Sequence, residues 1–119
     1  MATKDIVEAY IAAWNETDEA KRRDLLDQCW NDSGAYTDPM ADISGRDALF
    51  ALISQFQTQM PGAAIGMTSG IDQHHDRVRF GWKLTGAAQA IEGIDVGQIA
   101  ADGRLASIIG FWGINPPPA

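Results

Sequence analysis

Hydrophobic residues are spaced three or four positions apart through most of the first half of the chain. This spacing predicts three helices: from Ile6 to Asn15, from a cap at Thr17 to Trp30, and from Arg46 to Met60. The residues that these helices would bury are Ile6, Val7, Tyr10, Ala13 and Trp14, then Leu25, Leu26, Cys29 and Trp30, then Leu49, Leu52, Ile53 and Phe56. The segment Asn31-Asp32-Ser33-Gly34 is expected to break the second helix.

After Ala64 the hydrophobic period becomes two, which is typical of strands with one buried face. Strands are predicted over 65–71, 78–84, 91–97 and 105–112, with hairpin turns between them. Three helices followed by strands indicate an α+β fold, in which three N-terminal helices pack on a curved, mostly antiparallel sheet and enclose a pocket. We expect a single domain over residues 1–115 and a proline-rich tail over 116–119.

Composition narrows the classes of function. The formal net charge of −7 disfavours nucleic acid and anionic membranes as partners, and no apolar run is long enough to span a membrane. The single Cys29 cannot form an internal disulfide, which suits a reducing cytoplasm. With no Cys-x-x-Cys and no His-Glu-x-x-His motif, and with only the adjacent His74 and His75, no metal site is expected.

Three polar residues stand out as candidates for chemistry. Asp38 precedes Pro39, which restricts its backbone, and apolar residues flank it, an arrangement that suits a general base. Asp95 shares strand parity with Ile91 and should therefore face the apolar interior. Tyr10 lies on the buried side of the first helix. The alternatives are a turn-capping role for Asp38, a core role for Tyr10, and a solvated Asp95 displaced by a bulge.

These residues and their surroundings resemble the NTF2-like superfamily of cone-shaped, cystatin-like domains, which includes SnoaL-like polyketide cyclases and ketosteroid isomerase. The resemblance rests on segments 9–18 (AYIAAWNETD), 36–39 (YTDP), 93–95 (GID) and 102–104 (DGR). It implies that Asp38 is the general base, while Tyr10 and a protonated Asp95 bind the substrate carbonyl. Ketosteroid isomerase is itself the established example of that division of labour.

The resemblance implies a cofactor-independent isomerase or cyclase that acts on a small apolar ketone-bearing ligand. The expected wall of the binding pocket consists of Trp14, Trp30, Val78, Phe80, Trp82 and Trp112. Alternatives are a non-catalytic domain that binds small molecules, and a dehydratase or epoxide hydrolase on the same fold. Such domains commonly pair through the outer sheet face. Because Arg77, Arg79, Lys83 and Gln98 fall on that face, we expect a homodimer with a rather polar interface.

Overall fold

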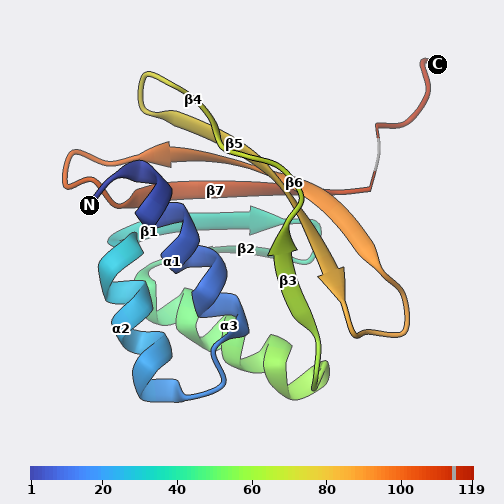
Figure 1. Ribbon diagram of the computed structural model, residues 1–119, viewed down its shortest axis with the longest axis horizontal. Helices are drawn as coiled ribbons and strands as arrows, with labels where there is room; N and C mark the ends of the chain where they lie inside the picture. The colour runs from blue at the N-terminus through green and yellow to red at the C-terminus, as the bar shows by residue number, and fades with distance from the viewer. Residues whose placement is uncertain (114) are drawn as a thin grey trace.

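The computed structural model describes residues 1–113 and 115–119, so the predicted domain 1–115 includes one residue, 114, outside the described part. Helices α1 (Thr3–Asn15), α2 (Glu19–Cys29) and α3 (Arg46–Gln59) lie on one side of the sheet (Figure 1). The strands are β1 (Trp30–Asp38), β2 (Ala41–Ser44), β3 (Ala64–Met67), β4 (Asp72–His74), β5 (Arg77–Thr85), β6 (Ile91–Ile99) and β7 (Leu105–Trp112). The α+β fold with three helices on a mostly antiparallel sheet is confirmed.

The sheet is ordered β2-β1-β7-β6-β5-β3, and β4 also pairs with β5. All pairs are antiparallel except β1 with β7. The parallel pair joins strands that are far apart in the sequence, because α3 and strands β3 to β6 come between them along the chain. This pairing places the end of β1 beside the middle of the sheet, where the pocket described below opens.

The predicted order of elements is wrong in one place. The segment from Trp30 to Ser44, expected to contain a break and no strand, forms the β1–β2 hairpin between α2 and α3. Its apolar residues do not alternate regularly, because the register of β1 shifts between Trp30 and Ala35 where a bulge interrupts the pairing. The helix before it ends at Cys29, and its cap is Asp18, whose Oδ1 accepts from the Lys21 backbone N–H at 3.0 Å.

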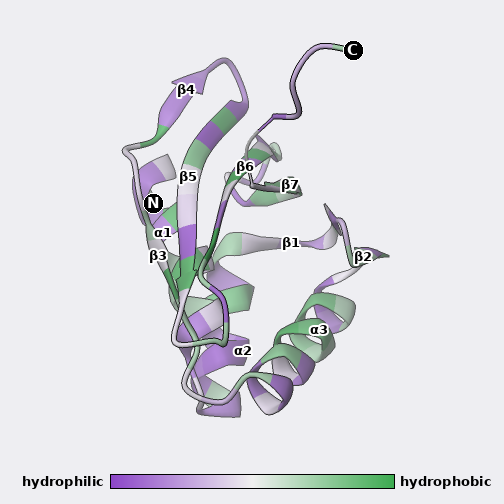
Figure 2. Cartoon of the chain, turned by 90° about the vertical axis from the view of Figure 1, so that its right-hand side faces the viewer, coloured by the Kyte–Doolittle hydropathy of each residue, from purple (hydrophilic) through white to green (hydrophobic). Residues whose placement is uncertain are grey.

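The predicted strand 65–71 is shorter in the structure, where β3 ends at Met67, and a separate strand that was not predicted, β4, begins at Asp72. β3 and β4 both pair with the long strand β5, one after the other along its length. β4 is hydrophilic throughout, as Figure 2 shows, and each of its residues is exposed. Alternation alone could not predict a strand there, since neither of its faces is buried.

The core lies between the helices and the inner sheet face. β5 alternates buried and exposed residues along most of its length, as its sequence predicts. The largest fully buried side chains are Trp30, Tyr10, Phe80, Leu26, Leu49, Ile53, Leu105, Ile108, Val7, Val78 and Cys29. Cys29 is thus a buried apolar side chain, and burial raises the pKa of its thiol to about 12.

A buried arginine ties α2 and α3 together. Arg22 donates from Nε to the Glu16 carbonyl at 3.0 Å, and from its two terminal nitrogens to Ser54 Oγ at 2.6 Å and Gln57 Oε1 at 2.7 Å. Neutral acceptors from the α1–α2 loop and α3 therefore satisfy the cation. A buried polar network of this kind holds the end of α1 against α3.

The outer sheet face is less polar than expected. Ile94 pairs with Phe111 and Val96 pairs with Ile109 across β6 and β7, and all four side chains are exposed, Phe111 by 66%. The expected charged residues lie beside this apolar surface on β5, where Arg79 forms an ion pair with Asp72. Among the described residues no helix is long and apolar enough to cross a membrane.

Candidate functional site

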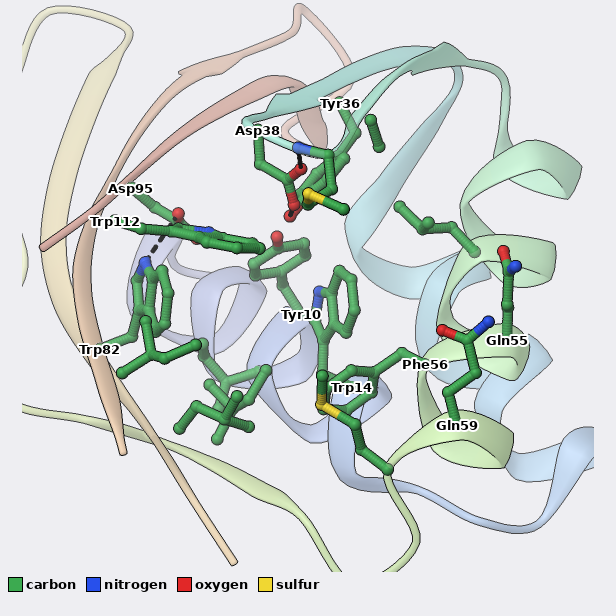
Figure 3. A pocket seen from close by; sticks show the side chains of 18 residues that line it. Tyr10, Trp14, Tyr36, Asp38, Gln55, Phe56, Gln59, Trp82, Asp95 and Trp112 are labelled. Carbon is green, nitrogen blue, oxygen red and sulfur yellow. Dashed lines mark hydrogen bonds between the residues drawn. The ribbon is translucent and has the colours of Figure 1, made fainter. Parts of the chain in front are cut away.

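A pocket of about 470 Å³ opens between the inner face of the sheet, α1 and α3 (Figure 3). This volume is in the range of small-molecule sites. The lining is mostly apolar and consists of Tyr10, Ile11, Trp14, Tyr36, Asp38, Met40, Ala41, Leu52, Gln55, Phe56, Gln59, Met60, Ile65, Trp82, Leu84, Ile91, Asp95 and Trp112. Its only ionisable carboxyl groups, among the described residues, are those of Asp38 and Asp95.

Asp38 ends β1 and is held on both of its carboxyl oxygens. Oδ2 accepts from the Tyr36 hydroxyl at 2.5 Å, and Oδ1 accepts from the Met40 backbone N–H at 2.7 Å. The second bond forms because the chain turns at Pro39 and brings the next amide back over the carboxyl group. Each oxygen keeps a further lone pair, so the carboxylate can still accept a proton.

Tyr36 also belongs to the site, although the sequence indicates it only as the first residue of the motif at 36–39. It lies two positions before Asp38 on the same strand face, so its hydroxyl reaches the carboxylate. Burial, and then the hydrogen bond to Asp38, raise the pKa of Tyr36 well above its ordinary value. The phenol therefore remains protonated and remains a donor. A Tyr-x-Asp pattern would have signalled the pair had the segment been predicted as a strand.

Asp95 points inward from the middle of β6, as its parity predicts, and it is only 6% exposed. Its Oδ1 accepts from the indole Nε1–H of Trp82 at 2.9 Å. Burial raises the pKa of Asp95, the hydrogen bond from Trp82 lowers it, and the nearby charge of Asp38 raises it again, so that the pKa lies at about 7. Near neutral pH a large share of Asp95 is consequently a neutral acid that can donate a hydrogen bond.

Gly110 lies between the two acids on β7. Asp95 pairs directly with Gly110, and Thr37 pairs with Ile109, so Asp38, Gly110 and Asp95 form a row across three neighbouring strands. A Cβ at position 110 would lie 2.9 Å from Asp95 Oδ1 and 3.6 Å from Asp38 Cβ. The bare backbone leaves the space in which the acids face one pocket, about two strand spacings of roughly 4.8 Å apart. No pattern in the sequence points to this glycine.

Tyr10 reaches the pocket from α1. Its ring stacks on Trp30, with centroids 5.8 Å apart, and its hydroxyl points into the space near both acids (Figure 3). Burial and then the charge of Asp95 raise the pKa of Tyr10 well above its ordinary value. The structure therefore brings all three candidate catalytic residues to one cavity, and both tyrosines there are hydroxyl donors.

The residues expected to form the pocket wall fall into two groups. Trp14, Trp82 and Trp112 line the cavity, whereas Trp30, Val78 and Phe80 do not. These three are fully buried in the core, where Trp30 stacks beneath Tyr10 and donates to the Gly34 carbonyl at 3.2 Å. Strand parity predicts the correct face for Val78 and Phe80. However, the helices decide which stretch of that face is covered.

The mouth of the pocket was not predicted. α3 places Gln55 and Gln59, one turn apart, among the lining residues, together with the apolar side chains of Leu52 and Phe56. Met40 lies at the other side of the opening and is largely exposed. An apolar opening with a few amide groups suits the entry of a mostly apolar molecule.

Other candidate chemistries lack support in this geometry. His74 and His75 are exposed at the β4–β5 turn, and neither lines the pocket. Arg77 and Arg79 form ion pairs with Asp76 and Asp72 on the outer surface. Within residues 1–113 and 115–119, no group of three or more His, Cys, Asp or Glu side chains could hold a metal ion.

Three helices on a curved sheet, with a pocket lined by two acids and two tyrosines, define a cone-shaped domain of the NTF2-like, cystatin-like fold. The family model of the SnoaL-like domain matches residues 7–108, so the chain belongs to the SnoaL-like family. No curated protein matches the chain.

Solved structures share this fold. The chain is similar to a proposed isomerase of the SnoaL-like family from Agrobacterium tumefaciens, with 30% identity and a TM-score of 0.87 over 96% of this chain and 100% of the other. An NTF2-like protein of unknown function from Exiguobacterium is 18% identical, with a TM-score of 0.78 over 92% and 99% of the two chains. A proposed ketosteroid isomerase from Kribbella flavida is 20% identical, with a TM-score of 0.70 over 98% and 83%.

Proposed function

We propose that the protein is a cofactor-independent isomerase or cyclase that acts on a small apolar carbonyl compound. One observation carries the proposal. A hydrogen-bonded carboxylate, Asp38, and an acid with a pKa near 7, Asp95, face the same apolar pocket. A carboxylate held by hydrogen-bond donors and a buried acid in the same pocket are suited to acid–base work on one ligand.

In the proposed reaction Asp38 removes a proton from the carbon α to the ligand carbonyl. The electron pair of that C–H bond forms the C=C bond of an enolate, and the carbonyl oxygen gains negative charge. Tyr10 and neutral Asp95 donate hydrogen bonds to this oxygen, which is stabilised most when its charge is largest. Where the ligand carries a C=C bond next to the deprotonated carbon, the enolate is a dienolate, and return of the proton from Asp38 to the far carbon of that bond completes an isomerisation. In a cyclisation the enolate carbon instead attacks a second carbonyl of the same molecule, whose oxygen becomes an alkoxide and takes the proton back from Asp38.

Tyr36 has a positioning part in this scheme. Its short bond to Oδ2 orients the Asp38 carboxylate from the same strand face, and the Met40 amide holds the other oxygen. Each oxygen still keeps a free lone pair, so the group can accept a proton from the ligand. The two bonds also limit rotation of the carboxyl group, so the base keeps one orientation toward the ligand.

Asp38→Asn tests the proposal. The amide keeps the shape of the side chain but cannot accept the proton, so α-proton exchange should fall by about 10²–10⁴-fold. Exchange is followed by NMR in deuterated water with a panel of small apolar enones, after their binding has been measured by calorimetry. Asp42→Asn, at an exposed residue of the neighbouring strand β2, is the matched control and should exchange as the wild type does. Equal exchange by wild type and Asp38→Asn would remove Asp38 from the mechanism.

A second candidate is a small-molecule-binding domain without catalysis. The observation that favours it is that both oxygens of Asp38 already accept hydrogen bonds from the chain, so fewer of their lone pairs are left to contact a ligand. The same experiment separates the two functions. Enones that bind in the pocket without any exchange support the binding domain.

A further inference from the structure

Trp82 makes a hydrogen bond that reaches diagonally across two strands. Its register partner on β6 is Gly93, yet its indole N–H donates to Asp95, two positions further along. Diagonal neighbours of this kind are within reach of large aromatic side chains. Trp82 is itself almost fully buried, so the bond lies in a largely dry part of the pocket wall.

Two glycines make room for this bond. A Cβ at Gly93 would lie 2.3 Å from Cζ2 of the Trp82 indole, so the ring can lie flat over β6 only because position 93 has no side chain. On the other side, a Cβ at Gly110 would lie 2.9 Å from Asp95 Oδ1. Oδ1 is therefore held between the indole N–H and the bare backbone of β7.

The second carboxyl oxygen is in a different environment. Within residues 1–113 and 115–119, Oδ2 of Asp95 forms no hydrogen bond, and no fully buried side-chain oxygen or nitrogen lacks a partner. Asp95 lines the pocket, so Oδ2 is accessible from the cavity. The ionisable groups that face this carboxyl group are Asp38 and Tyr36 from β1 and Tyr10 from α1.

An indole N–H can only donate, so the oxygen that it contacts must act as an acceptor. We propose that Trp82 is a positioning residue that reserves Oδ1 of Asp95 as an acceptor and leaves Oδ2 to carry the proton that Asp95 donates to the ligand oxygen. The inference rests on the proposed function for the role of that proton. The orientation of the acid itself is independent of any activity. The bond also prevents rotation of the carboxyl group, so the donor is oriented before the ligand arrives.

Trp82→Phe tests the inference, with the pKa of Asp95 as the readout. The ¹³C shift of its carboxyl carbon is followed against pH in protein labelled at aspartate. Loss of a donor that favours the charged form should raise the pKa by about one to two pH units. Trp14→Phe is the matched control, since it removes the same ring volume from the same pocket on the far side of Tyr10 from Asp95 (Figure 3), and in this variant the pKa of Asp95 should stay near the wild-type value.

A second replacement covers the case in which Trp82→Phe does not fold. Site-specific incorporation of 3-benzothienylalanine at position 82 keeps the bicyclic ring and lacks the N–H donor, so the pKa should rise as in Trp82→Phe. An unchanged pKa of Asp95 in this protein would overturn the inference, as would equal shifts in Trp82→Phe and Trp14→Phe. Neither readout needs turnover, so the inference can fail while the Asp38→Asn test succeeds, and the reverse.

Discussion

The raised pKa of Asp95 predicts an unusual dependence of stability on pH. The folded protein binds this proton more tightly than the unfolded chain, because the pKa rises from its ordinary value of 3.8 to about 7 on folding. A group whose pKa is raised on folding contributes its full stabilisation at pH values below its pKa in the unfolded chain. This stabilisation is lost as the pH rises through its pKa in the folded protein. Asp95 should therefore destabilise the fold progressively between about pH 4 and pH 7, and by a constant amount above that range.

The size of the effect follows from the pKa. A rise from 3.8 to about 7 corresponds to about 4 kcal/mol in the free energy of unfolding, of which about 3 kcal/mol is lost between about pH 5 and pH 8.5. Asp95→Asn removes the titration and keeps an acceptor oxygen for the Trp82 indole. The variant should therefore gain stability relative to the wild type as pH rises, by about 3 kcal/mol over this interval.

Urea denaturation at several pH values measures this difference directly. Asp24→Asn, at an exposed residue of α2, is the control and should change the unfolding free energy by less than about 0.5 kcal/mol at every pH. If the difference in unfolding free energy between Asp95→Asn and the wild type stayed constant from pH 5 to about 8.5, the reasoning would be refuted. Asp95 would then have the same pKa in the folded and the unfolded protein.

Two further predictions concern β7. Gly110→Ala places a Cβ 2.9 Å from Asp95 Oδ1 and should destabilise the fold by about 1–3 kcal/mol in thermal or urea unfolding, whereas Gly66→Ala, where nothing lies within 4 Å, should be nearly neutral. The exposed apolar side chains of Ile94, Val96, Ile109 and Phe111 on β6 and β7 predict a homodimer through the outer sheet face. Phe111→Lys should shift the protein from dimer toward monomer in sedimentation, and a wild-type protein that is monomeric at micromolar concentration would contradict this prediction.

The local spacing of apolar residues in the sequence predicts much of the fold. The three helices and the main strands follow from spacing, because a helix or strand with one buried face must repeat its apolar residues with its own geometry. The same parity placed Asp95 on the inner face. The β1–β2 hairpin was missed since its bulge interrupts that period, and with it the Tyr36–Asp38 pair was missed.

The sequence by itself determined the three helices, the inward faces of β5 and β6, and the three polar candidates Tyr10, Asp38 and Asp95. Only the tertiary structure decided which inward residues line a cavity and which are core, because that depends on where α1 and α3 cross the sheet. It also decided the row of Asp38, Gly110 and Asp95, since the parallel pairing of β1 with β7 joins segments about seventy positions apart. Contacts between such distant segments leave no local period in the chain, and so the environment of each acid is a property of the folded molecule.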